Sequence, residues 1–195
     1  MTLPREAGRS SSVTRSFRFE SDVLSVLDEE ANRMGISVNA LVGIILRRYV
    51  EFTRFLSKID MVVVNREILT SLLESLDEQT VYKLGVGLGQ TVLHDTIMFW
   101  KKEITEKTVM EYIEKVLCRD GQLGTYDESR MPGGEMAIVV RHRLGKNGSR
   151  FLEGYLHGGL KHTLDIKALF EITDSSVKCQ IPSRRSDDFS RTKSS

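Results

Sequence analysis

Hydrogen-bonding side chains alternate with bulky ones near the start of the chain. From Val13 to Phe19, the side chains of Thr14, Ser16 and Arg18 would share one face of a β-strand, because successive residues of a strand point to opposite faces. That face offers one guanidinium group and two hydroxyls that can donate or accept hydrogen bonds. The other face would carry Val13, Arg15, Phe17 and Phe19. No second strand follows nearby, so we expect this strand to find its partner outside the segment.

The four histidines are the next candidates for chemistry, and they lack the spacing of a metal site. His157 and His162 are five residues apart, which places them on diverging faces of a helix. His94, close to Phe99 and Trp100 near the end of a predicted helix, is the least unsuitable haem ligand. Ordinary structural or surface histidines explain all four positions, so we expect no metal and no cofactor.

Two further patterns suggest sites but lack their essential parts. The glycine-rich run Gly85–Gly89 has neither the lysine nor the serine of a P-loop and follows no predicted strand, so we interpret it as a site of close helix packing. Asp127, Glu128 and Glu135 are expected in a glycine-rich loop, with no base or nucleophile beside them. The sequence therefore predicts no enzyme activity.

Two helices are expected directly after the alternating segment. Ser21 is a suitable N-cap for the first helix, and Gly35 is a typical residue to end it. Ser37 would cap the second helix, which is apolar nearly all round from Ala40 to Leu46. A unit of about 45 residues cannot bury such a helix with its own chain. Dimerisation would solve both problems, because the lone strand would pair with its copy and the second helix would pack on its copy.

Strand, helix, the turn Met34-Gly35-Ile36-Ser37 and an apolar second helix together resemble the ribbon-helix-helix repressors of the Arc and MetJ type. The resemblance implies a dimer whose paired strands lie in the major groove of double-stranded DNA. Thr14, Ser16 and Arg18 would then contact base edges, and Arg18 is suited to a bidentate contact with guanine.

The resemblance also implies that the backbone N–H groups of Ser37, Val38 and Asn39 hold a DNA phosphate at the start of the second helix. Arg15 departs from the family pattern, which usually has an apolar residue there. The alternative for the strand is an ordinary edge strand of a larger domain. Gly43 fits either a close approach of the two second helices or a tolerated glycine, which costs about 1 kcal/mol relative to alanine.

The remaining sequence predicts a second, mixed region. Helical spacing recurs after Asn65 and Asp77, which are suitable caps, and period-two alternation then marks a strand from Met136 to Leu144. A helix is expected from Ser149. The last elements are two strands, 166–173 and 177–181. Helices followed by antiparallel strands predict an α+β domain with a small antiparallel sheet.

The stretch from Leu144 to Tyr155, LGKNGSRFLEGY, and the final hairpin are similar to the small-molecule-binding vinyl-four-reductase and haem nitric-oxide-binding type domains. This resemblance implies a sensor or assembly domain with a small-molecule effector as a candidate partner. It assigns no ligand-binding residue.

Composition sets limits on the whole chain. Of 195 residues, 40% are hydrophobic, and 28 basic side chains nearly balance 27 acidic ones, so any DNA contact has to come from a local patch. Cys118 and Cys179 are far apart and are interpreted as core or free thiols of a reducing compartment. The longest apolar run is too short to span a bilayer. We expect a disordered arm at 1–12, the DNA-binding module at 13–58, the α+β domain at 59–182 and a disordered tail at 183–195.

These observations predict a homodimeric, sequence-specific transcriptional regulator of the repressor type, in the cytoplasm and associated with the nucleoid. Its second region would sense an effector or support assembly, with a tetramer as the larger alternative. The competing interpretation is a DNA-organising or protein-interaction module whose second region only oligomerises. An antitoxin is less favoured, because the second region contains too much patterned core for a toxin-binding tail.

Overall fold

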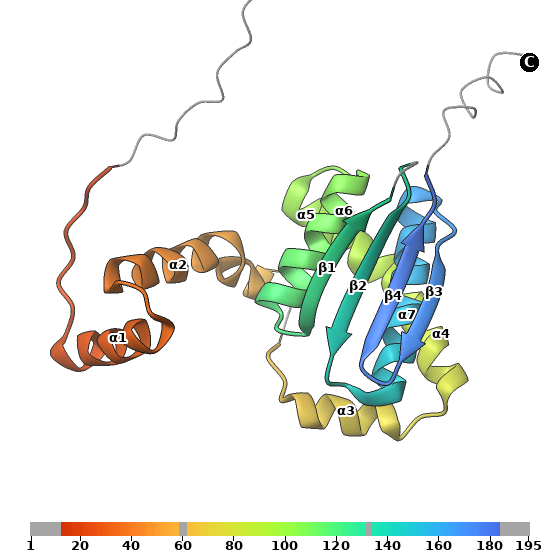
Figure 1. Ribbon diagram of the computed structural model, residues 1–195, viewed down its shortest axis with the longest axis horizontal. Coiled ribbons are helices and arrows are strands. Elements are labelled where there is room, and N and C mark those ends of the chain that lie inside the picture. The colour runs from red at the N-terminus through yellow and green to blue at the C-terminus, as the bar shows by residue number, and fades with distance from the viewer. Residues whose placement is uncertain (1–12, 59–61, 132–133, 184–195) are drawn as a thin grey trace, which may run out of the picture. The chain divides into compact units, whose positions relative to one another are not determined.

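The computed structural model describes residues 13–58, 62–131 and 134–183 (Figure 1). Residue contacts divide the chain into two compact units, Met1–Val50 and Glu51–Ser195, and each is described by itself. The predicted domain boundary lies slightly further along the chain, after residue 58. The predicted arm 1–12 and the tail beyond Ser183 lie outside the described residues.

The first unit contains the two expected helices. α1 (Ser21–Met34) starts at the residue predicted as its cap, so that assignment is wrong by one position; Glu20 occupies the cap without a side-chain hydrogen bond. Gly35 ends α1 with φ of 66°, a left-handed conformation that glycine adopts without a steric penalty. α2 (Val38–Glu51) follows directly after Ser37 and reaches the boundary between the units.

The second unit begins with helices. They are η1 (Thr53–Lys58), α3 (Arg66–Glu74), α4 (Glu78–Leu88), η2 (Gly89–Leu93), α5 (His94–Lys101), α6 (Glu106–Glu111), η3 (Tyr112–Asp120) and, after two strands, α7 (Gly145–Leu164). Asn65 and Asp77 cap α3 and α4 as predicted, because their side-chain oxygens accept backbone N–H groups of the first turn. α7 begins before Ser149, its predicted first residue. His94 does not lie near a helix end, because α4, the π-helical η2 and α5 follow one another without a break.

A four-stranded antiparallel sheet completes the second unit in the part of the chain that the structure describes. Its strands are β1 (Gly124–Arg130), β2 (Met136–His142), β3 (Leu169–Thr173) and β4 (Ser176–Ile181), in the order β1-β2-β4-β3. The α+β prediction is therefore confirmed. β1 was not predicted, and the placement of Asp127 and Glu128 in a loop was wrong, because both lie on this strand.

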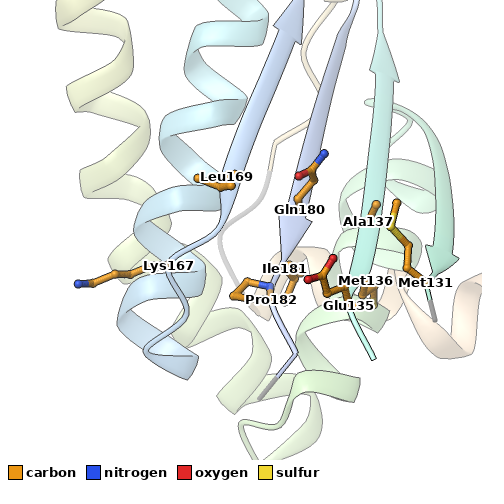
Figure 2. A pocket seen from close by; sticks show the side chains of 9 residues that line it. All are labelled: Met131, Glu135, Met136, Ala137, Lys167, Leu169, Gln180, Ile181 and Pro182. Atoms are coloured by element: carbon orange, nitrogen blue, oxygen red, sulfur yellow. The ribbon is translucent and has the colours of Figure 1, made fainter. Parts of the chain in front are cut away.

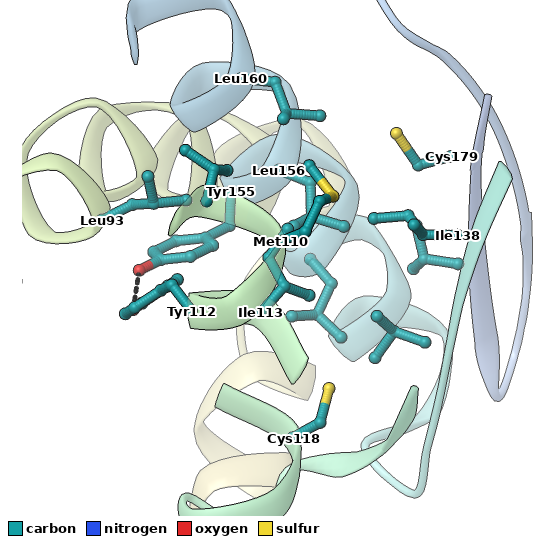
Figure 3. Close-up of a cluster of buried hydrophobic side chains, with 14 of the residues drawn as sticks. Leu93, Met110, Tyr112, Ile113, Cys118, Ile138, Tyr155, Leu156, Leu160 and Cys179 are labelled. Carbon is teal, nitrogen blue, oxygen red and sulfur yellow. Dashed lines mark hydrogen bonds between the residues drawn. The ribbon is translucent and has the colours of Figure 1, made fainter. Parts of the chain in front are cut away.

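The helices of this unit cover one face of the sheet, and its other face lies in front of them in Figure 1. Residues on the covered face are fully buried, including Ile138 and Val140 of β2 and Val177 and Cys179 of β4. They join side chains of η2, α6, η3 and α7 in one hydrophobic core (Figure 3).

Close packing of α4 and the adjoining η2 against α7 depends on glycines of all three elements. A Cβ atom added at Gly85 or Gly89 would lie 2.3 or 2.1 Å from a backbone oxygen of α7, and one added at Gly154 or Gly158 would lie 2.3 Å from a backbone oxygen of α4. Real Cβ atoms do not approach backbone oxygens so closely. Interpretation of the glycine run as a helix-packing site is confirmed.

Candidate nucleic-acid interface

The predicted base-contacting residues lie in the segment that precedes α1. Residues 13–20 form neither helix nor strand, and all their side chains are exposed, including those of Thr14, Ser16 and Arg18. Arg15 is exposed as well. A strand requires a backbone partner, so the β-ribbon remains a prediction. In the structure, all of residues 13–20 are accessible to a partner.

The predicted phosphate-contacting residues lie at the start of α2. Ser37 and Asn39 are exposed, Val38 is half-buried, and the Ser37 hydroxyl oxygen accepts the N–H of Ala40 at 3.2 Å. The first intrahelical bond runs from Leu41 N–H to the Ser37 carbonyl, and the Ala40 N–H is bonded to the Ser37 hydroxyl, so the N–H groups of Val38 and Asn39 are the ones available to a ligand. No acidic residue occupies the first turn of α2, and a negative ligand would therefore meet no local repulsion.

These two groups belong to separate segments joined by α1. No hydrogen bond or ion pair links them among residues 13–58, so their predicted cooperation on one duplex is not visible in a single chain.

A third feature of this unit is its exposed apolar surface. Within residues 13–50, only Ala31 and Leu41 are buried. Large apolar side chains that remain 40% to 71% exposed are Val13, Phe17, Phe19, Val23, Leu24, Val26, Met34, Ile44, Ile45, Leu46, Tyr49 and Val50. Exposed apolar side chains are unusually numerous for a unit of this size.

In the second unit, a buried serine and histidine resemble part of a catalytic triad but have the opposite polarity. Leu144 N–H donates to His142 Nδ1 at 3.1 Å, so Nε2 must carry the ring proton. Nε2 therefore donates to Ser149 Oγ at 2.9 Å, and the serine hydroxyl donates to the Thr173 carbonyl. A nucleophilic serine would have to give its proton to Nε2. The arrangement ties β2 to α7 and to the end of β3, and burial lowers the pKa of His142, which favours the neutral ring.

The other histidines form pairwise contacts. His157 Nδ1 is hydrogen-bonded to the Tyr82 hydroxyl, and the rings of His94 and His162 meet edge to face at 5.6 Å. Within the described residues, no group of three or more His, Cys, Asp or Glu side chains is arranged to hold a metal ion.

Both cysteines are free and buried, as predicted for core or free thiols. Burial raises the pKa of Cys118 and of Cys179 to about 12, which keeps the thiols protonated and poorly reactive. The buried hydroxyls of Tyr112 and Tyr155 form a hydrogen bond of 2.6 Å inside the same core (Figure 3). Burial raises the pKa of both phenols, so they also stay neutral.

A cavity of about 320 Å³ lies where β2 begins and β4 ends (Figure 2). Its walls are mainly apolar and include Met131, Met136, Ala137, Leu169, Ile181 and Pro182. The side chain of Lys167 points away from the other labelled residues in Figure 2. This cavity is at the small end of the range of ligand pockets and offers few polar groups to orient a ligand.

Sequence reasoning missed an exposed apolar strip on the second unit. We define the α4 strip as Leu84, Leu88 and Val92, which are 37% to 45% exposed; residues 84–92 contain no charged side chain. Helical spacing after Asp77 predicts that these residues share one side of the helix and face the core. In the structure, α7 packs against the neighbouring glycine face, so this apolar side stays exposed. The signal that could have shown this is the glycine spacing itself.

No protein-family model matches the chain, and no curated protein matches it either. Among the described helices, none combines the length and the apolar character that crossing a membrane would need.

Proposed function

We propose that the chain is a dimeric, sequence-specific DNA-binding transcriptional regulator that reads the major groove with paired N-terminal segments. The observation that carries the proposal is the exposed apolar surface of the first unit, in which two helices bury only Ala31 and Leu41. A second copy of the same unit is the simplest cover, because it would also give residues 13–19 an antiparallel strand partner.

The apolar residues of α2 support a helix-to-helix contact in that dimer. Ile44, Ile45 and Leu46 point in three successive directions around the helix, and all are about half exposed. A Cβ atom added at Gly43 would meet nothing within 4 Å in one chain, so this position leaves room for a second backbone.

Paired strands would place Thr14, Ser16 and Arg18 on one outer face. Arg18 would donate two hydrogen bonds to guanine, and the two hydroxyls would read either donors or acceptors on neighbouring bases. Ser37, Val38 and Asn39 would hold a backbone phosphate through their N–H groups and fix the position of the ribbon in the groove.

The second unit would regulate DNA binding by sensing or assembly, and the α4 strip favours assembly. A second copy is the occupant we propose for this strip. The N-terminal dimer would hold two such units at high effective concentration, and an uncharged strip meets its own copy without like-charge repulsion. A tetramer would follow if the two contacts join different pairs of chains.

The test of DNA reading uses the full chain and a site selected from random DNA. Arg18→Ala should weaken binding to that site by about 1–3 kcal/mol per symmetric contact and relax the base preference. Arg33→Ala is the matched control, because Arg33 is an exposed arginine of the same unit that pairs with Glu30. Equal losses for both variants, on selected and random DNA alike, would contradict the assigned reading face.

Footprinting separates the regulator from the alternative DNA-organising module. A regulator should protect a few discrete sites at concentrations that leave the surrounding DNA accessible. Uniform protection that spreads along the DNA would favour the organising module, with the α4 strip as its assembly surface.

A further inference from the structure

A basic hollow lies on the second unit, apart from the apolar cavity of Figure 2. Its volume is about 280 Å³, and it is formed where α3 begins, β1 begins and β2 ends. Arg66, Arg141 and Arg143 line it together with Gly124 and Thr125, and no acidic side chain is among the lining residues. Such a cluster is unexpected in a chain whose basic and acidic residues nearly balance.

The three arginines differ in what they already bind. Arg141 forms an ion pair with Asp127 of β1, and Arg66 Nη2 donates to the carbonyl oxygen of Gln122 at 3.2 Å, a neutral acceptor. The Arg143 side chain forms no hydrogen bond or ion pair with any residue that the structure describes. Within residues 13–58, 62–131 and 134–183, the charges of Arg66 and Arg143 therefore have no acidic partner.

Close packing of β1 against β2 fixes the backbone at one edge of the hollow. Gly124 lies so close to β2 that an added Cβ atom would be 1.9 Å from the Arg141 carbonyl oxygen, so only glycine fits there. The preceding turn contains Gln122 with φ of 53°, and Arg66 holds its carbonyl. Position 124 is therefore restricted to glycine, and the hollow is bordered there by backbone alone.

We propose that this hollow binds the phosphate group of a small phosphorylated ligand. Guanidinium groups present forks of N–H donors that match phosphate oxygens, and a phosphomonoester carries close to two negative charges at neutral pH. Two uncompensated arginines match that charge, and the volume accommodates a phosphate with a small organic substituent.

A phosphate of duplex DNA is the other source of the same chemistry, and the surroundings favour the small ligand. A duplex presents a row of phosphates and requires a basic surface that extends beyond one hollow. Here Glu67 follows Arg66 on α3, and Asp127 and Glu128 lie along β1. These acidic side chains would repel the phosphates on either side.

The test is calorimetric titration of the full-length protein with inorganic phosphate and with glycerol phosphate, in the absence of DNA. We expect saturable binding of one equivalent per chain, and none with glycerol. Arg143→Ala should weaken binding about tenfold or more, because it removes charge-assisted hydrogen bonds. The matched control is Arg130→Ala, an exposed arginine paired with Glu128 and roughly 20 Å away along β1; it should bind phosphate like the original chain.

The proposal is overturned if phosphate does not bind saturably, or if both variants weaken it equally. It is also overturned if Arg143→Ala changes only the affinity for duplex DNA, because the arginines would then serve the DNA backbone. The unfolding temperature of each variant shows whether it is folded. Phosphate binding is measured in the absence of DNA. A negative result would therefore leave the proposed reading of DNA by Arg18 unaffected.

Discussion

The two units of this protein have similar amphipathic helices, but they bury them in different ways. In the second unit, Leu93 and Ile97 of one helical segment and Leu156 of another are completely covered by the same chain. In the first unit, α1 and α2 leave most of their large apolar side chains exposed. An apolar stripe therefore predicts a surface suited to burial, and the rest of the fold decides whether the same chain covers it.

Glycine shows the same contrast at the level of single atoms. Gly89 is in contact with the α7 backbone, whereas Gly43 of α2 has open space around the position of a side chain. Packing within one chain explains why position 89 is a glycine. The proposed dimer would explain why position 43 is a glycine, so alanine substitutions at these two positions compare the packing of the two units.

The largest expected effect comes from placing a charge on the exposed surface of the first unit. Leu46→Asp should abolish dimer formation and lower DNA affinity by more than about 100-fold, because Leu46 is half exposed on the face of α2 that carries Gly43 and each copy would bring an unpaired carboxylate into the interface. Sedimentation equilibrium and DNA titration measure the two effects.

The control for that change is Leu169→Asp in the second unit, where the side chain is 70% exposed on β3. It should leave DNA affinity and dimer formation through the first unit unchanged. If Leu46→Asp leaves the dimer and its DNA affinity intact, this face of α2 is not the interface and the proposed dimer is wrong.

The next largest effect is expected from disrupting the helix packing within the second unit. Gly89→Ala should lower its free energy of unfolding by about 3 kcal/mol, because the new Cβ atom would overlap the Tyr155 backbone oxygen and force η2 and α7 apart. Gly87→Ala is the matched control on the exposed side of the adjoining α4, and it should stabilise the unit by up to about 1 kcal/mol. Denaturant unfolding followed by circular dichroism measures both, and equal effects would contradict the close crossing.

Local signals were sufficient for much of the second unit. Caps at Asn65 and Asp77, alternation in β2 and the glycine run each depend on neighbours in sequence, and the structure contains all three. β1 was missed because its sequence, GTYDESR, is polar; its strand form depends on pairing with β2.

The candidate sites were harder to predict, because they depend on contacts between distant segments rather than between neighbours in sequence. Thr14, Ser16 and Arg18 could be selected from alternation alone, but residues 13–20 form no strand in the structure, so the proposed pairing depends on a second chain. Arg66 and Arg143 could not be connected from the sequence, because the fold brings together residues that are far apart in the chain. Their shared hollow depends on Gly124 and on the positive φ of Gln122 rather than on any motif.

A smaller effect is expected in the pH dependence of the stability of the second unit. Burial lowers the pKa of His142 below its ordinary value of 6.5, so the unfolded chain binds the proton more readily than the folded unit does. The second unit should therefore be most stable above pH 6.5 and lose stability as the pH falls below that value. Protonation of Nδ1 would also remove the acceptor of the Leu144 N–H group.

This pH dependence can be assigned with one variant. His142→Gln removes the titrating ring, and the unfolding temperature of the second unit should then change less between pH 7 and pH 5. An unchanged pH profile in this variant would show that other groups cause the dependence.

The smallest effect is a change of sign at Gly43. In one chain, Gly43→Ala should stabilise α2 by about 1 kcal/mol, as at Gly87, because the new methyl group meets no neighbour. If two α2 helices approach closely at this position, the same methyl group overpacks the contact at a cost of about 1–3 kcal/mol, which exceeds the gain. We expect the second result: weaker dimerisation and a lower unfolding temperature of the first unit, with a larger deficit at low protein concentration, since dilution favours the separated chains. Stabilisation at every protein concentration would mean that the α2 helices do not meet at Gly43, and the dimer would then have to use the face that carries Ile45 without a close backbone approach.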